Sequence, residues 1–186
     1  ENFRAVLGRL VDDYIAFFRL RQEKGTLRSA ARGQGLSQGS YCFTEELPDD
    51  VPQARLDQMW LYMDAQEAAG ISPAMYEDLV FPAYRKLMAL CGRLSCEATH
   101  PIWEGALSHL TNLRKVSISP WCDEDFMGEA LRGTGITYLR KPPATLLGME
   151  TPLDEDAVTA CFRKTAGAAR GCKLEIAQRD VYRIGK

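Results

Sequence analysis

Side chains able to do acid–base, nucleophilic or metal-binding chemistry follow each of five short apolar segments. The segments lie at residues 59–65, 93–98, 115–121, 136–142 and 173–180. In parallel α/β proteins the reactive residues gather at the carboxyl ends of the strands, which open onto one edge of the sheet. The residues found there are Asp64, Gln66, Glu67, Cys96, Glu97, His100, Trp121, Cys122, Asp123, Arg140, Lys141, Gln178, Arg179 and Asp180. We therefore predict a common rim that carries acidic, thiol and cationic groups.

Several of these residues also have a structural explanation. Asp123, followed by two more acids, suits the N-cap of the next helix, where the helix dipole favours negative charge. Lys141 precedes a proline and fits a solvated loop, and His100 fits a capping or exposed histidine. Glu97 is harder to explain in this way, because a carboxylate directly after a buried strand has few possible structural roles.

Two cysteines at successive strand ends suggest a metal site. Neighbouring strands lie about 4.8 Å apart, so Cys96 and Cys122 would be close together in a parallel sheet. Two thiolates, with His100 or Glu97 as a third ligand, could hold zinc and leave one position for substrate. The spacing is not a zinc signature, and buried reduced thiols are the alternative.

The spacing of apolar residues predicts the helices and strands that position the rim. Residues 4–24 carry apolar side chains three and four apart, which predicts a helix ending near Gly25. The five apolar segments then alternate with expected helices at 73–91, 101–113, 123–133 and 154–171, the first with Ser72 as N-cap and Gly92 as its stop. Pro82 should kink or interrupt that helix. The segment from 26 to 55 is rich in Gly, Ser and Gln and is expected to be a long loop.

Such alternation favours right-handed β/α units and a parallel sheet. The sheet could be doubly wound or belong to a (β/α)₈ barrel. No GxGxxG or P-loop follows any strand, which disfavours a nucleotide-binding open sheet. A barrel needs about 250 residues, so with 186 residues and five strands the chain would be part of one.

The amino-acid composition narrows the class of protein to which the chain can belong. The chain is 46% hydrophobic with a net charge of −2, which predicts one globular domain or part of one and gives no basic patch for nucleic acid. No apolar run is long enough to cross a membrane, and no secretion signal opens the chain. We expect a cytoplasmic protein whose six cysteines are reduced.

Several segments resemble one family. "WLYMDAQEAAGISPAMYEDLVFPAYRKLM", "CE", "LRKVSISPWCDED" and "LRKPPATLL" resemble bacterial proteins related to uroporphyrinogen decarboxylase and to the barrel methyltransferases that serve corrinoid proteins. The resemblance runs from about Leu10 to the end. It implies that the chain is the C-terminal half of a (β/α)₈ barrel. We therefore expect one partial domain over 1–186, in which the pattern along the chain predicts a helix at 1–25, a long loop at 26–55 and repeated strand–helix units at 56–186.

The resemblance also marks the barrel-mouth residues, which are Gln66, Glu67, Cys96, Glu97, Trp121, Cys122, Lys141 and Asp180. It implies methyl transfer or a related corrinoid- or tetrapyrrole-linked reaction on a small-molecule substrate. We expect Glu97 or Asp180 to act as general acid or base and Lys141 to stabilise an anion. The expected substrate contacts are Gln66, Glu67, Trp121 and Arg140, and the expected metal ligands are Cys96 and Cys122.

The chain departs from the related methyltransferases at the zinc ligands. Where they carry His-x-Cys, this chain reads Leu94-Ser95-Cys96, and their later cysteine is replaced near Asp180. The alternatives are therefore a non-catalytic protein that binds a corrinoid or a partner protein, and a uroporphyrinogen decarboxylase. A corrinoid would be carried by a partner protein. About half of the barrel mouth would be missing, so we expect the chain to be inactive alone. Half a barrel also leaves strand edges unpaired, so we expect the chain to self-associate or to cover its edge with the first helix.

Overall fold

The fold is a parallel sheet with helices between its strands. The computed structural model describes residues 2–27, 51–63, 70–97, 100–147, 152–178 and 181. Five strands, all parallel, are ordered β1-β2-β3-β4-β5: β1 (Trp60–Met63), β2 (Arg93–Glu97), β3 (Leu113–Ile118), β4 (Thr137–Arg140) and β5 (Lys173–Ile176). All five lie where the apolar segments predicted them, which confirms the α/β class.

The chain divides into two compact units, which we describe separately. Unit 1 comprises residues 1–96 and 101–114, and unit 2 comprises 97–100 and 115–186. In unit 1, β1 and β2 pair so that Leu61 lies beside Leu94 and Met63 beside Cys96. In unit 2, β3 pairs with β4 and β4 with β5, which aligns Ser117, Leu139 and Glu175 across the three strands.

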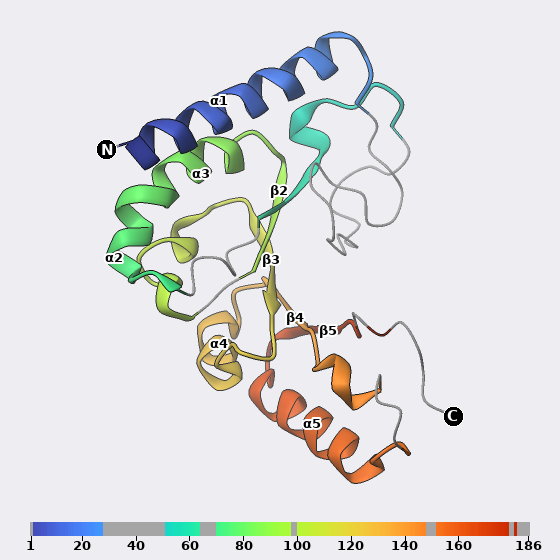
Figure 1. Cartoon of the computed structure of the whole chain (residues 1–186). Coiled ribbons are helices and arrows are strands. Elements are labelled where there is room, and N and C mark those ends of the chain that lie inside the picture. The colour runs from blue at the N-terminus through green and yellow to red at the C-terminus, as the bar shows by residue number, and fades with distance from the viewer. Residues whose placement is uncertain are drawn as a thin grey trace. The chain divides into compact units, whose positions relative to one another are not determined.

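The first helix of unit 1, α1 (Asn2–Glu23), ends in a Schellman motif. Gly25 adopts φ 63°, a left-handed conformation that glycine accepts without strain. Its N–H donates to Gln22 O (3.0 Å), and the Thr26 N–H donates to Arg21 O (2.9 Å). The predicted C-cap at Gly25 is thus confirmed. α1 packs along α3 (Phe81–Met88), as Figure 1 shows.

The helix that contains Pro82 is interrupted by a π-helical turn. Ser72 accepts a hydrogen bond from the Met75 N–H and caps α2 (Pro73–Met75), as predicted. The turn η3 (Tyr76–Val80) follows, and the Phe81 N–H donates to Tyr76 O, five residues back. Pro82 has no N–H and its ring would meet the carbonyl four residues earlier in an α-helix, so the wider turn accommodates it.

The end of this helix differs from the prediction. α3 stops at Met88, four residues before Gly92. The Asn112 side-chain amide donates to Met88 O (2.9 Å) and to Cys91 O (3.1 Å), so a residue from a distant part of the chain satisfies carbonyls at the helix end. A local sequence pattern does not reveal such a cap.

The helix predicted at 101–113 was wrong. The chain instead forms two 3₁₀ turns, η4 (His100–Ile102) and η5 (Leu107–His109). Gly105 lies between them and is a weak helix former. The end of the Glu77 side chain lies directly over Gly105, where a β-carbon would overlap it.

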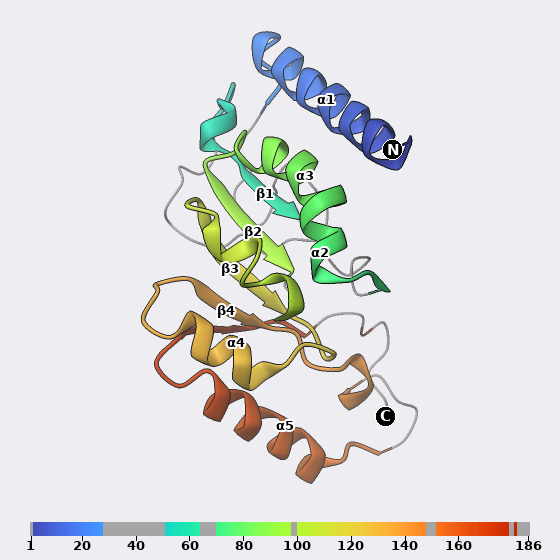
Figure 2. The ribbon, with the colours of Figure 1, turned by 90° about the vertical axis from the view of Figure 1, so that its left-hand side faces the viewer.

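Unit 2 joins β3, β4 and β5 through α4 (Glu124–Leu131) and α5 (Glu155–Ala168). The helices pack on each other and α4 packs on β4 (Figure 2). They meet at Gly128, where a β-carbon would overlap the Ala168 carbonyl oxygen. A short 3₁₀ turn, η6 (Ala144–Leu146), follows β4.

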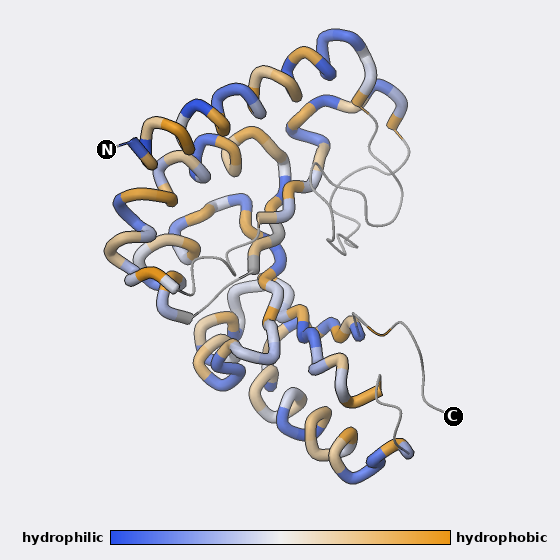
Figure 3. The backbone as a smooth tube through the Cα atoms, viewed as in Figure 1, coloured by the Kyte–Doolittle hydropathy of each residue, from blue (hydrophilic) through white to orange (hydrophobic). Residues whose placement is uncertain are grey.

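None of the helices in the described ranges combines the length and the apolar character needed to cross a bilayer. Figure 3 shows hydrophilic residues interleaved with hydrophobic ones along α1, the longest helix.

Candidate functional site at the strand ends

The segment after β3 supplies one predicted cap and one exposed aromatic ring. Asp123 accepts hydrogen bonds from the N–H groups of Asp125 (3.1 Å) and Phe126 (3.0 Å), which confirms it as the N-cap of α4. Trp121 is 79% exposed, whereas Cys122 is buried. An indole held this openly beside a strand end is available to stack on a flat ligand or partner.

Alternation along the strands of unit 2 defines two faces. The Tyr138 hydroxyl donates to Glu124 O (3.3 Å) and Arg140 contacts the Glu124 carboxylate, so these β4 side chains face the helices. Their neighbours in β4 therefore point the other way. By the observed register, this distal face carries Lys115, Ser117, Thr137, Leu139, Lys173 and Glu175, and Ser119 and Lys141 continue the alternation just beyond the strand ends.

The distal face carries buried polar groups. Lys115 is fully buried, and its Nζ lies 2.5 Å from Glu175 Oε2 across β4. Ser117 is also fully buried, and its hydroxyl has no hydrogen-bond partner among the described residues. Buried polar groups usually find partners, and the side chains of Ser95 and Glu97 in β2 lie outside the described residues.

Arg140, a predicted substrate contact, is placed on the helix-facing side. Its guanidinium forms an ion pair with Glu124 (Nη2 to Oε1, 3.0 Å), and both side chains are about 95% buried. Its Nη1 donates to the carbonyl oxygens of Ile118 (3.1 Å), Ser119 (2.8 Å) and Lys141 (3.1 Å). The guanidinium therefore ties the ends of β3 and β4 to α4, and its role as a substrate contact stays a prediction.

Glu124 is the centre of this buried network. Thr165 of α5 donates to Glu124 Oε2 (2.9 Å), and Lys164 lies 3.6 Å from Oε1. Burial, followed by the charge of Glu124, raises the pKa of the Tyr138 hydroxyl well above its usual value, so Tyr138 stays a neutral donor.

Cys96 faces the interior of unit 1. It is buried, and burial, with a smaller effect of Cys91, raises the pKa of its thiol well above the usual value. Burial, followed by the smaller effect of Cys96, raises the pKa of Tyr76 in η3 well above its usual value. In this environment the Cys96 thiol stays protonated.

The zinc site stays a prediction. Among the residues that the structure describes, no three His, Cys, Asp or Glu side chains converge as metal ligands would. Glu97 ends β2, but its side chain and that of His100 lie outside the described residues. Gln66, Glu67 and Asp180 lie outside them entirely, so their predicted roles remain untested. Lys141 is part-buried and continues the distal face, and its N–H donates to Ile118 O (2.9 Å).

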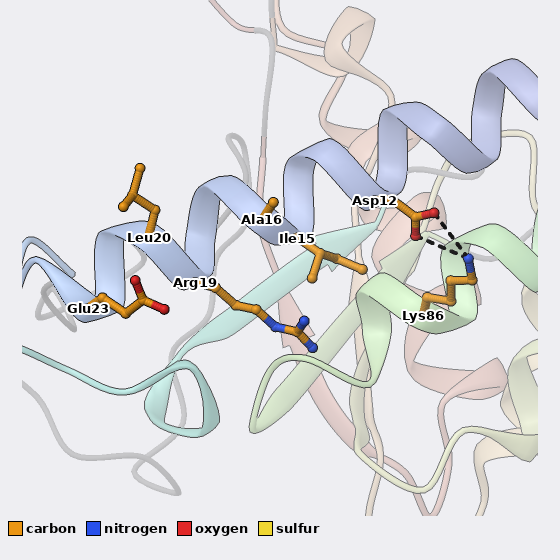
Figure 4. A pocket seen from close by; sticks show the side chains of 7 residues that line it. All are labelled: Asp12, Ile15, Ala16, Arg19, Leu20, Glu23 and Lys86. Atoms are coloured by element: carbon orange, nitrogen blue, oxygen red, sulfur yellow. Dashed lines mark hydrogen bonds and ion pairs between the residues drawn. The ribbon is translucent and has the colours of Figure 1, made fainter.

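A separate groove runs along α1 in unit 1 (Figure 4). It measures about 630 Å³ and is lined by Asp12, Ile15, Ala16, Arg19, Leu20, Glu23 and Lys86. Lys86 of α3 forms an ion pair with Asp12 (3.1 Å). Most of its lining is exposed, and it holds none of the predicted site residues.

The sequence reasoning missed Lys115, Ser117 and Glu175. Their signal was present, because Lys115, Ser117 and Ser119 alternate with Val116 and Ile118 in the third apolar segment. Polar residues at every second position of a buried strand indicate one polar face.

Comparison of the chain with protein-family models, with curated proteins and with solved structures finds no match in any of the three. The class of the protein is therefore defined by its fold, a mixed α/β arrangement with five parallel strands.

Proposed function

We propose that these strands belong to a (β/α)₈ barrel of the uroporphyrinogen decarboxylase type and that the protein transfers methyl groups in a corrinoid- or tetrapyrrole-linked reaction. The observation that carries the proposal is the strand order. Doubly wound sheets reverse their order at a switch point, where the ligand binds. The order β1-β2-β3-β4-β5 has no reversal, as expected for consecutive units of a barrel.

The distal face supports the same proposal. In a barrel the side chains opposite the helices fill the interior, and those nearest the carboxyl ends of the strands reach the active site. Ser119 and Lys141 would then lie toward the mouth, and Lys115, Ser117 and Glu175 deeper inside. A buried ion pair with a neighbouring buried hydroxyl suits a polar barrel interior.

The reaction class comes from the resemblance in sequence. A reduced corrinoid carried by a partner protein would supply the methyl acceptor, and the methyl donor would leave with the electron pair of the broken bond. A general acid that protonates the departing donor lowers the barrier, and Glu97 or Asp180 would supply that proton. Lys141 would stabilise the negative charge before protonation, and Trp121 would contact the flat substrate or corrinoid. No step requires zinc.

Binding provides the test, since we expect the 186-residue chain to be inactive alone. Hydroxocobalamin and a uroporphyrin are titrated separately, and bound ligand is measured by equilibrium dialysis. Trp121 is exposed whereas Trp60 and Trp103 are buried, so a flat ligand at the rim should stack on Trp121. We expect Trp121→Ala and Lys141→Met each to weaken binding, with Lys86→Met as the control.

A protein that contains the whole proposed barrel is then assayed for methylcobalamin formation from cob(I)alamin and simple methyl donors. Binding without methyl transfer would support the alternative, a corrinoid-binding protein without catalysis, which the exposed Trp121 also suits. No binding of either ligand would refute both. Metal content of the wild type, Cys96→Ala and Cys122→Ala proteins tests zinc independently.

A further inference from the structure

α1 carries a second apolar face that is open to solvent. Its buried side chains, Val11, Ile15 and Phe18, face unit 1. Six other large apolar residues are each between 40% and 61% exposed: Phe3, Val6, Leu10, Tyr14, Phe17 and Leu20, which we call the α1 stripe. Isolated exposed apolar side chains are ordinary, but a continuous row of them marks an interaction surface.

The spacing of the α1 stripe matches a coiled-coil seam. Positions 3, 6, 10, 13, 17 and 20 alternate three- and four-residue steps, as the a and d positions of a heptad do. All are apolar except Asp13, and Tyr14 beside it belongs to the stripe. The stripe spans roughly 26 Å of helix.

We propose that the α1 stripe is the interface of a homodimer in which α1 pairs antiparallel with α1 of a second copy. A two-fold interface must be complementary to itself. The step pattern three, four, three, four, three reads the same in both directions, so it meets this condition. Phe3 then faces Leu20 of the second copy, Val6 faces Phe17, and Leu10 lies at the centre beside Asp13.

The charges of Arg9 and Asp13 favour the antiparallel pairing of the two α1 helices. Arg9 and Asp13 form a loose pair within one helix, with 3.9 Å between Arg9 Nε and Asp13 Oδ2. In the antiparallel dimer Arg9 of each copy lies beside Asp13 of the other, which gives two symmetric ion pairs. A parallel arrangement in register would instead place the two Asp13 carboxylates side by side, and like charges repel.

The available area suits a second copy. The exposed part of each stripe side chain is on the order of 100 Å², so the two stripes together would bury roughly 1,200 Å². This is near the lower limit for stable protein interfaces, and we expect a dissociation constant on the order of 10 µM.

Sedimentation equilibrium of the full 186-residue chain, from about 1 to 200 µM, tests the proposal. Leu10→Glu places a carboxylate beside Asp13 of the second copy and should weaken the dimer at least about 30-fold. Ala5→Glu adds the same charge to an exposed position on a different side of α1, and it should leave the dimer unchanged. Circular dichroism confirms that both variants keep their helix content.

Charge exchange and disulfide trapping test the orientation. Arg9→Asp should weaken the dimer, and the double variant Arg9→Asp/Asp13→Arg should restore it. In a mixture of Phe3→Cys and Leu20→Cys proteins, mass spectrometry should find position 3 linked to position 20.

Four outcomes would overturn the proposal. The first is a wild-type chain that stays monomeric to 200 µM, which would leave the stripe for a different partner. The second is a dimer that Leu10→Glu leaves intact, and the third is a dimer that is lost instead with Ile176→Lys in β5. The fourth is a predominant link between two copies of Leu20→Cys.

Discussion

The ion pair between Arg140 and Glu124 should be the interaction whose loss destabilises unit 2 most. Arg140→Met keeps much of the side-chain length and removes the guanidinium. The Glu124 carboxylate then stays buried, with the Thr165 hydroxyl and the more distant ammonium of Lys164 as its remaining contacts. Three carbonyl oxygens also lose their donor.

The expected cost follows from burial. Removing one partner of a buried pair costs about 3–5 kcal/mol, because the other charge is left without compensation. Lys164 provides a matched control: it approaches the same carboxylate but is 63% exposed, so Lys164→Met should cost less than about 1 kcal/mol.

Urea unfolding followed by circular dichroism measures both free energies. Glu124→Gln and the double variant Glu124→Gln/Arg140→Met complete a double-mutant cycle. The double variant should lose about 1–3 kcal/mol less free energy of unfolding than the sum of the losses in the two single variants. A loss below about 1 kcal/mol for Arg140→Met, or strict additivity in the cycle, would refute the reasoning.

Two further predictions use matched pairs. Gly128→Ala should lower the free energy of unfolding in urea by about 1–3 kcal/mol, because the new β-carbon would overlap the Ala168 carbonyl oxygen. Gly167→Ala in α5 adds a β-carbon where there is open space, so it should raise the free energy of unfolding by up to about 1 kcal/mol. Equal effects of the two variants would contradict the packing of α4 on α5. Alkylation at pH 8, mapped by mass spectrometry, should modify the part-exposed Cys161 well before Cys96. Burial raises the pKa of the Cys96 thiol and keeps it protonated and unreactive. Fast labelling of Cys96 in the folded protein would contradict this.

The sequence correctly predicted the features that depend on residues close together in the chain. Apolar runs located all five strands, and the caps at Gly25, Ser72 and Asp123 are confirmed because each depends on neighbouring residues. The helix expected at 101–113 is replaced by two 3₁₀ turns on either side of Gly105, a weak helix former that apolar periodicity alone does not take into account. The end of α3 was misplaced because its cap comes from Asn112.

The candidate site was harder to predict because it depends on which way each side chain points. Arg140 and Lys141 are adjacent in sequence, yet only Lys141 continues the distal face. A shift of one residue in strand register would exchange their roles. Glu124 was interpreted as one of several first-turn acids, and nothing near it in sequence shows that Arg140 and Thr165 enclose it.

The π-helical turn at η3 has a consequence for changes in chain length. Such a turn holds one residue more than an α-helical turn over the same rise, so it can take up an insertion or deletion without rotating the helix that follows. Removing one residue between Glu77 and Val80 should therefore leave Leu87 and Met88 of α3 buried. The shorter turn would bring the Pro82 ring against the carbonyl four residues before it. Homologues that lack this residue should therefore also lack the proline.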